Sequence, residues 1–385
     1  MTARTLTVLA ALYFFHFFRH GMVLPLVPLY ASEMGASTAF VGVIVSGFNL
    51  LSLCLALYVG RVADKVAVRT MLLVAAAGNI VYSLLLLVAQ GPWGIFVAQL
   101  SGGLGFLFLI VSSQAAVSQI PQQGKRERGF GLLSFAAALG QGTGPVVGGW
   151  IVSVAGYTTV FILAVGLALT GLSAIWVRHE KTGTPGQIPQ WREAGTLLKD
   201  KRFLGVLLFT LSILFAVSLR GSFLPLLLRQ KGFSPGLIGA YLSLFAVAMT
   251  VVRVWVGRLM GATSRPFLVA IALALITIPV ALMPLVHNQW GVAGALVVFG
   301  LGFGISQPLS MVMVSDLSHS ENSGLAMGLR FTTITAATFS SPLILGAVAE
   351  IAGLSAAFVV PTLLLLTTAV VLWGGWHRLR AQQLK

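Results

Sequence analysis

The sequence predicts an all-α membrane protein in which twelve transmembrane helices form two six-helix bundles around a central cavity. The 385-residue chain is 57% hydrophobic and only 9% charged, whereas about a quarter of the residues of a soluble globular protein are charged. Apolar runs of about 20 residues, the length that crosses a bilayer as a helix, recur from end to end. These runs are continuous rather than alternating, which excludes a transmembrane β-barrel. In addition, the second half of the chain repeats the first.

Each helix is expected where one apolar run lies between charged, glycine or proline residues. In chain order the expected spans are 6–30, 39–60, 70–90, 93–119, 129–154, 157–177, 203–228, 236–257, 266–287, 290–316, 324–350 and 355–376. The N-terminal residues, MTARTLT, lack the small-residue cleavage site of a signal peptide. The first apolar run is therefore expected to stay uncleaved as the first span. The single cysteine, Cys54, excludes an intramolecular disulfide and is expected to be a small buried thiol.

Basic residues are distributed unevenly between the predicted loops. With both termini on the cytoplasmic side, 18 of the 24 Lys and Arg residues fall on that side, and the outer loops hold only Arg229 and Lys231. The positive-inside rule therefore predicts a multi-pass protein of the inner (cytoplasmic) membrane with cytoplasmic termini. Because the positive charge gathers at span ends and not on one soluble face, the net charge of +15 does not indicate a nucleic-acid partner.

The longest polar segment, 178–202, divides the chain into an N-terminal bundle, 1–177, and a C-terminal bundle, 203–385. Its proline and glycine residues suit a cytoplasmic linker. A shift of 197 residues aligns the halves without a gap from 37 to 161, and it superposes the GLGF of 103–106 on that of 300–303. A duplicated six-span unit is the plan of many secondary transporters, in which the substrate binds near mid-membrane between the halves. A channel would need a selectivity filter, for which the sequence offers no candidate.

The loop GRVADKVAVRT, 60–70, resembles motif A of the major facilitator superfamily. The matching residues are Gly60, Asp64, Lys65 and Arg69, while alanine and valine replace the pattern's second glycine and one basic residue. The resemblance implies a conformational latch at the inner face. Asp64 is expected to face the partial positive charge at the N-terminal end of span 324–350.

Span 129–154 contains GLLSFAAALGQGTGPVVGG, which resembles motif C of the drug:proton antiporter branch of that superfamily. All six fixed positions match: Gly131, Gly140, Gly144, Pro145, Gly148 and Gly149. In such a helix, small residues allow close packing and the proline introduces a kink. The resemblance covers essentially the whole chain. It implies a monomeric secondary active transporter, without a cofactor, that exports small amphipathic molecules by alternating access in exchange for protons (multidrug-type efflux).

Charged and polar residues within the spans are candidates for substrate binding. They are Arg19, His16, His20, Arg220, Gln99 and Gln114. Arg19 lies about thirteen residues, or roughly 20 Å, into the first span, and the i, i+3, i+4 spacing places it on one helix face with His16 and His20. Arg220 precedes an LPL sequence, as Arg19 does, so the two arginines are expected to face each other across the repeat axis.

These residues leave the substrate class open. The family often places a proton-transferring arginine where this chain has Gln99, and none of the nine acidic residues lies in the middle of a span. Two converging arginines favour an anionic group, because the guanidinium fork binds carboxylate or phosphate through two hydrogen bonds. The alternative is therefore export or exchange of an anionic metabolite, a siderophore-like compound or a lipid headgroup bound by Arg19 and Arg220. His16 and His20 could carry coupled protons, since histidine titrates near neutral pH.

Other classes of function find less support. The sequence contains no H-E-x-x-H zinc motif, no interior carboxylate dyad and no nucleotide-binding P-loop, so no catalytic residue, metal ligand or enzymatic activity is expected. A non-transporting membrane receptor on the same scaffold is a third alternative. Arg253 and Arg330, near inner span ends, are expected to extend to the membrane surface.

Overall fold

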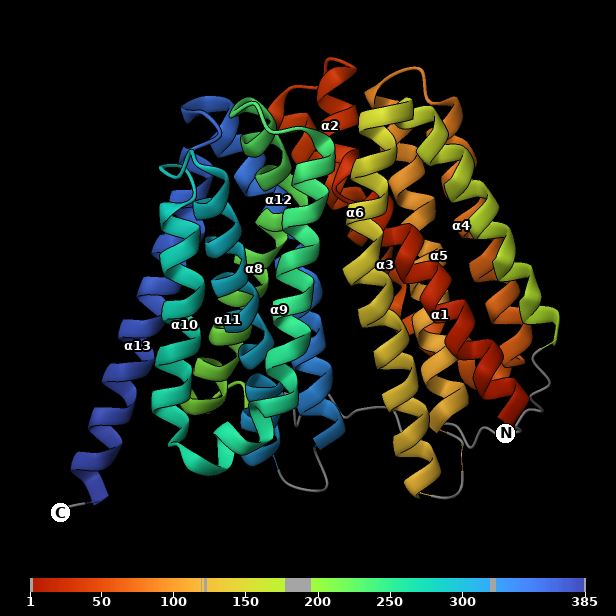
Figure 1. Cartoon of the computed structure of the whole chain (residues 1–385). Coiled ribbons are helices and arrows are strands. Elements are labelled where there is room, and N and C mark those ends of the chain that lie inside the picture. The colour runs from red at the N-terminus through yellow and green to blue at the C-terminus, as the bar shows by residue number, and fades with distance from the viewer. Residues whose placement is uncertain (1–2, 119, 121–122, 177–194, 319–322, 384–385) are drawn as a thin grey trace. The chain divides into compact units, whose positions relative to one another are not determined.

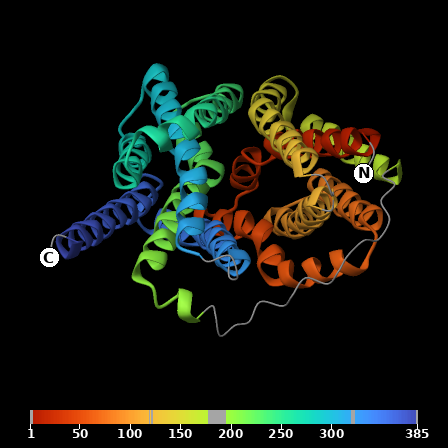
Figure 2. The ribbon, with the colours of Figure 1, turned by 90° about the horizontal axis from the view of Figure 1, so that it is seen from below.

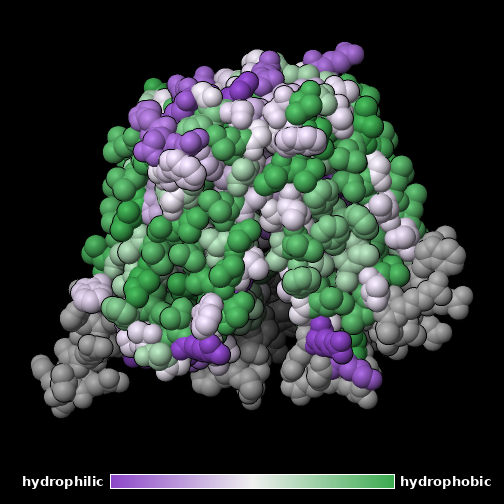
Figure 3. Space-filling model, viewed as in Figure 1, coloured by the Kyte–Doolittle hydropathy of each residue, from purple (hydrophilic) through white to green (hydrophobic). Residues whose placement is uncertain are grey.

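The structure is a computed structural model that describes residues 3–118, 120, 123–176, 195–318 and 323–383. Over these residues it contains helices and turns but no strand (Figure 1). Eleven helical segments within them are long and apolar enough to cross a membrane. On the face shown in Figure 3, hydrophobic side chains cover the middle of the helices and hydrophilic residues gather near their ends. The predicted helical membrane fold is confirmed.

The helix bounds follow the apolar runs closely. The first half contains α1 (Ala3–Val23), α2 (Leu26–Glu33), α3 (Thr38–Lys65), α4 (Val68–Val88), α5 (Pro92–Ser118), α6 (Gln123–Leu169) and the 3₁₀ helix η1 (Thr170–Trp176). The second half contains α8 (Lys201–Gln230), α9 (Pro235–Ala262), α10 (Arg265–Leu282), α11 (Gln289–Asp316), α12 (Ser323–Ala352), the 3₁₀ helix η2 (Ala356–Phe358) and α13 (Val359–Gln383).

One expected span is divided in the structure. The run 6–30 is two helices, α1 and α2, because Pro25 interrupts the backbone hydrogen bonding and stands at the N-terminal cap of α2. The separate spans 129–154 and 157–177 correspond to the 47-residue segment α6 and the following η1, and the break between them is confirmed at Gly156. A straight helix of that length would measure about 70 Å, more than twice the hydrocarbon thickness of a bilayer. Gly156, with φ of 77° and ψ of 175°, divides it into two helical stretches.

The internal repeat is visible in the backbone. Four described glycines have positive φ, and the shift of 197 residues relates them in pairs, Gly35 with Gly232 and Gly156 with Gly353. Two residues after the first pair, Ser37 and Ser234 each accept a hydrogen bond from a backbone N–H three residues later, both at 3.3 Å. The same turn and serine cap therefore begin α3 and α9.

Close contacts divide the chain into two units. The N-terminal unit comprises described residues of 1–187 and 228–243, and the C-terminal unit comprises those of 188–227 and 244–385. Within the N-terminal unit α1 packs against α6, and α4 packs against α5 (Figures 1 and 2). The predicted linker, 178–202, lies mostly outside the described residues, so the domain boundaries drawn from it stay a prediction. Cys54, expected to be buried, is exposed because no neighbouring helix of the described chain covers its side of α3.

Candidate functional site

Arg19 of α1 is bound to α4 inside the N-terminal unit. Its side chain is only 1% exposed. Nη2 donates a hydrogen bond of 2.6 Å to Oδ1 of Asn79, and Nη1 donates one of 3.2 Å to Oγ of Ser83. The guanidinium carbon also lies 5.1 Å from the ring centroid of Tyr82, within the range of a cation–π contact. The arginine therefore cross-links α1 and α4.

The α4 partners share one helix face and are themselves held in place. Asn79, Tyr82 and Ser83 have i, i+3, i+4 spacing. Asn79 donates its Nδ2 proton to the carbonyl of Ala75 at 2.8 Å, and the Ser83 hydroxyl donates to the carbonyl of Asn79 at 2.9 Å. Both partners of the guanidinium are neutral. The single ion pair among the described side chains joins Arg265 and Asp316. No described carboxylate therefore neutralises Arg19.

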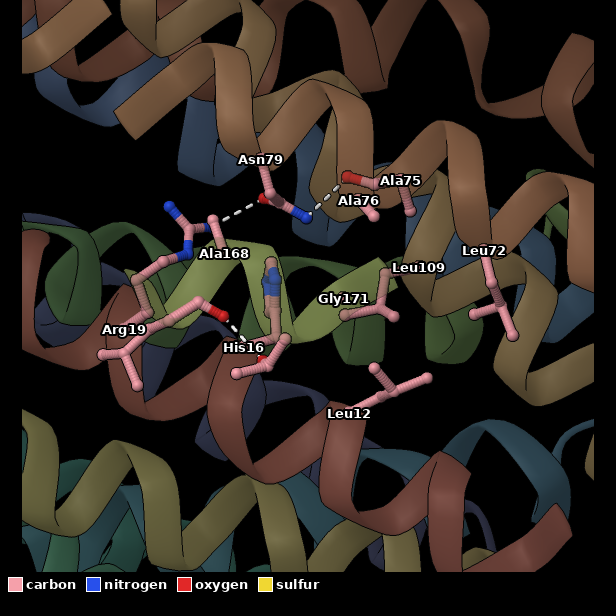
Figure 4. A pocket seen from close by; sticks show the side chains of 12 residues that line it. Leu12, His16, Arg19, Leu72, Ala75, Ala76, Asn79, Leu109, Ala168 and Gly171 are labelled. Atoms are coloured by element: carbon pink, nitrogen blue, oxygen red, sulfur yellow. Dashed lines mark hydrogen bonds between the residues drawn. The ribbon is translucent and has the colours of Figure 1, made fainter. Parts of the chain in front are cut away.

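A small pocket of about 30 Å³ lies beside this cross-link (Figure 4). We call it the Arg19 pocket; it is lined by Leu12, His16, Arg19, Leu72, Ala75, Ala76, Asn79, Leu109, Leu167, Ala168, Thr170 and Gly171, from α1, α4, α5, α6 and η1. His16 is 7% exposed, and its Nε2 is buried without a hydrogen-bond partner. Sites for drug-sized molecules measure about 300–1,000 Å³, so the Arg19 pocket admits only a small ion or about two water molecules.

The two histidines beside Arg19 face aromatic rings. The rings of His16 and His20 are stacked, with centroids 6.2 Å apart and planes 7° apart. His20 also lies 5.0 Å from Phe48 of α3 and 5.7 Å from Phe106 of α5. Arg19 thus points to α4, while His20 points to α3 and α5.

Arg220 of α8 occupies the corresponding environment in the C-terminal unit. Its guanidinium carbon lies 4.6 Å from the ring centroid of Phe245, and its Nε is buried without a partner. Phe245 in turn packs against Phe303, with centroids 6.0 Å apart. The shift of 197 residues superposes these two phenylalanines on the pair that contacts His20. By its contacts with these rings Arg220 therefore takes the place that His20 has in the N-terminal unit, whereas the sequence pattern had paired it with Arg19.

The glycines of the motif on α6 have different surroundings. A Cβ built on Gly140 would lie 2.6 Å from the nitrogen of Phe18, one on Gly144 would lie 2.5 Å from its oxygen, and one on Gly148 would lie 2.3 Å from the oxygen of Met22. These three glycines, at intervals of four residues, let α6 touch the backbone of α1.

The remaining motif residues serve other contacts. Gly149 faces the backbone oxygen of Pro235, which would lie 2.3 Å from a Cβ added to this glycine. Gly131 has open space around it. Pro145 lies within α6 and touches Gly21 of α1, whose added Cβ would lie 3.3 Å from the proline ring. The motif thus helps to set the position of the helix that carries His16 and Arg19.

The loop motif is only partly described. Gly60 has open space around it, and Arg69 is exposed at the start of α4. The side chains of Asp64 and Lys65 and the residues 319–322 before α12 lie outside the described part of the chain. The latch stays a prediction.

The two glutamines are not brought to the Arg19 pocket. Gln99 of α5 is 0% exposed, and neither atom of its amide has a hydrogen-bond partner. Gln114 is exposed.

Sequence reasoning missed the hydrogen-bond partners of the two buried arginines Arg19 and Arg330. The polar triplet of Asn79, Tyr82 and Ser83 within an apolar run was the available signal for the α4 face. Arg253 is exposed, as a residue that extends to the surface would be. The same expectation is wrong for Arg330, which is 7% exposed.

Arg330 belongs instead to a polar network within the C-terminal unit. Its Nε donates to Oγ of Ser310 at 2.9 Å, and its Nη2 donates to Oε1 of Gln307 at 2.9 Å. The Ser310 hydroxyl lies 2.6 Å from that of Thr210. The network joins α8, α11 and α12.

Comparisons with known proteins agree with this architecture. The family model of the Major Facilitator Superfamily matches residues 9–339. The chain is 23% identical to Multidrug resistance protein 1 of Bacillus subtilis (strain 168) over 343 residues, and 21% identical to Quinolone resistance protein NorA of Staphylococcus aureus (strain COL) over 347 residues; each match covers 86% of both chains.

Solved structures show the same fold at low identity. A mutant of the nucleoside transporter NupG superposes with a TM-score of 0.82 at 14% identity, covering 96% of this chain and 99% of that one. A bacterial homologue of the human lysosomal transporter Spinster gives 0.80 at 13% identity, covering 96% of both chains. The chain is a transporter, not an enzyme, and it belongs to the Major Facilitator Superfamily.

Proposed function

We propose that this transporter is a secondary active exporter of small amphipathic molecules, working by alternating access in exchange for protons. The observation that carries the proposal is the motif on α6, complete in all six positions, whose Gly140, Gly144 and Gly148 pack on the backbone of α1. The relatives named for multidrug and quinolone resistance, each matched over 86% of both chains, support the same conclusion.

The setting of the proposed transport is the inner membrane. Eleven apolar helical segments supply a multi-pass protein. The excess of Lys and Arg in alternate loops supports cytoplasmic termini. We propose a monomer with N-terminal and C-terminal bundles at 1–177 and 203–385, joined by a cytoplasmic linker at 178–202.

Proton coupling is proposed to use His16 and His20. Histidine titrates near neutral pH, and these two stack on each other beside a buried arginine. The place at which the antiporter branch carries a proton-transferring arginine is occupied by Gln99, which cannot ionise. The carboxylates whose side chains are described, among them Glu33, Asp316 and Glu350, lie at helix ends.

A flux assay tests the proposal. Purified protein in proteoliposomes is given an imposed pH gradient and a panel of cationic, neutral and anionic amphipathic dyes. We expect gradient-dependent movement of at least one dye. A His16→Asn/His20→Asn double variant should lose the dependence on the gradient but keep counterflow, whereas His287→Asn, at an exposed histidine, serves as the matched control. Unchanged gradient-driven transport in the double variant would refute the proton role.

An anionic substrate is the second candidate. The buried Nε of Arg220 without a partner favours it, because an anion would complete the hydrogen bonding of the guanidinium. Arg19 already donates to Asn79 and Ser83, so the anionic metabolite, siderophore-like compound or lipid headgroup would depend mainly on Arg220. Anionic panel members should then compete for transport, and Arg220→Gln should abolish that competition. Export of cationic dyes that persists in both Arg19→Ala and Arg220→Ala would exclude this alternative.

The same assay separates a transporter from a receptor. A non-transporting receptor would bind panel compounds in equilibrium dialysis yet show no flux with or without a gradient. Binding together with gradient-dependent flux is the result that we expect.

A further inference from the structure

We propose that the Arg19 pocket is a binding site for a small monovalent anion, with chloride as the abundant ligand, which acts as the resident counter-ion of Arg19. The site lies wholly within the N-terminal unit. The proposal does not rest on the direction or the substrate of transport.

The charge of Arg19 is the first argument. The guanidinium stays ionised at physiological pH and is 1% exposed. Its hydrogen-bond partners, Asn79 and Ser83, are neutral, and no described carboxylate pairs with it. A buried charge is stable when it is both hydrogen-bonded and paired with an opposite charge. Arg19 is hydrogen-bonded but not paired, so an anion at its side would complete the arrangement.

A second, independent donor lines the same pocket. His16 is 7% exposed, and its Nε2 has no hydrogen-bond partner. Figure 4 shows the side chains of His16 and Arg19 both extending from α1 toward α4. An imidazole that carries its proton on Nε2 donates from that atom whether or not the ring is charged. An anion in the pocket would therefore accept from His16 and compensate Arg19 together.

The other polar groups of the lining are already engaged. Oδ1 of Asn79 accepts from Arg19, and Nδ2 donates to Ala75. The hydroxyl of Thr170 donates to the carbonyl of Leu167 at 2.6 Å. The rest of the lining is leucine, alanine and glycine. Such a wall suits a polarisable halide better than a strongly hydrated oxyanion that needs many donors.

The volume selects among anions. The pocket's volume of about 30 Å³ has room for about two water molecules at roughly 10–15 Å³ each. A single chloride ion fits such a space, whereas phosphate, sulfate and carboxylate metabolites are larger. A water molecule would also fit, but it would satisfy Nε2 of His16 without compensating the charge of Arg19. The charge therefore favours the halide.

Thermal unfolding of the purified full chain in lipid nanodiscs tests the site. Sodium chloride is exchanged for sodium gluconate at constant ionic strength, so that general screening does not change. A ligand that binds only the folded state raises the midpoint by linkage, and we expect about 2 °C for each tenfold rise of chloride above its dissociation constant. Bromide should replace chloride, and sulfate should not.

Two substitutions and one control locate the effect. Asn79→Asp places a carboxylate at the atom that now lies 2.6 Å from Nη2 of Arg19, and this built-in anion should abolish the chloride response. Arg19→Met removes the charge and should also abolish it. Arg330→Met removes a similarly buried arginine whose partners lie in the C-terminal unit, and it should keep the full response.

Bromide also provides a direct measurement on the unmodified chain. Crystals grown with bromide should show an anomalous peak among Arg19, His16 and Asn79, and this result does not depend on whether any variant folds. Equal midpoints in chloride and gluconate, or density in the pocket without an anomalous signal, would mean that the pocket holds only water and would overturn the proposal. A chloride response that persists in Asn79→Asp would place the anion elsewhere and overturn it as well.

Discussion

Gly144 lies where α6 meets the backbone of α1, and replacing it with alanine tests the packing argument most directly. An added Cβ would lie 2.5 Å from the oxygen of Phe18 and 2.7 Å from the nitrogen of Met22. Both are backbone atoms, so no side-chain rotation relieves the clash. Ordinary van der Waals contact begins at 3.4 Å, and α1 and α6 would have to separate locally by about 0.9 Å.

Gly142 is the matched control on the same helix. An alanine Cβ there meets nothing within 4 Å. Both substitutions gain up to about 1 kcal/mol in helix propensity, so the difference between the two variants isolates the clash. Overpacking of this kind costs about 1–3 kcal/mol. We expect Gly142→Ala to leave the free energy of unfolding unchanged or to raise it. The free energy of unfolding of Gly144→Ala should be about 1–3 kcal/mol lower than that of Gly142→Ala.

The assay is thermal unfolding followed by the fluorescence of the eight tryptophans. With about 2.1 cal/mol/K of unfolding entropy per residue, the expected gap between the two midpoints is about 1–4 °C. The separation of α1 should also lengthen the hydrogen bond of Arg19 to Asn79, so Gly144→Ala should transport more slowly than Gly142→Ala. Equal midpoints and equal fluxes would refute the conclusion that close approach of α6 positions α1.

Three further predictions use the same unfolding assay. Gln99→Leu should raise the free energy of unfolding by about 1–3 kcal/mol, because it replaces a buried amide whose two atoms have no partner; a lower value would mean that the amide is hydrogen-bonded in the membrane. Gly103→Ala and Gly300→Ala should each destabilise by at least about 1–3 kcal/mol, since the added Cβ would lie 1.7 Å and 2.4 Å from a carbonyl oxygen of the neighbouring helix; tolerance at either position would contradict the equivalence of the two repeats. Asp316→Asn should change stability by less than about 1 kcal/mol, because its 3.3 Å ion pair is 39% and 52% exposed, and a larger loss would indicate a buried network.

Much of the fold could be predicted because it follows from local properties of the chain. The length of an apolar run and the thickness of a bilayer determine where a helix crosses the membrane. The shift of 197 residues, found from residues such as the GLGF pairs, also relates the turns at Gly35 and Gly232. The division of the first span has a local cause too, because Pro25 interrupts it. The break between 154 and 157 was predicted correctly, since Gly156 leaves the helical conformation there.

The direction of buried side chains could not be predicted in this way. Spacing places His16, Arg19 and His20 on one face of α1, yet Arg19 turns to α4 while His20 contacts rings of α3 and α5. Arg330 looked like a residue free to reach the surface, but Ser310 and Gln307 bind it inside the C-terminal unit. Helical periodicity specifies an angle around one helix, and it does not specify which helix lies opposite.

The sequence by itself determined that this protein is a duplicated helical membrane transporter, because hydrophobicity, charge asymmetry and glycine patterns act along the chain. Only the tertiary structure decided that Arg19 is enclosed beside a small pocket, with neutral hydrogen-bond partners 60 and 64 residues away in the chain. Such contacts depend on how helices distant in the chain pack against one another. That packing depends in turn on close backbone approaches such as that of Gly144 to Phe18, which the sequence of one helix alone does not determine.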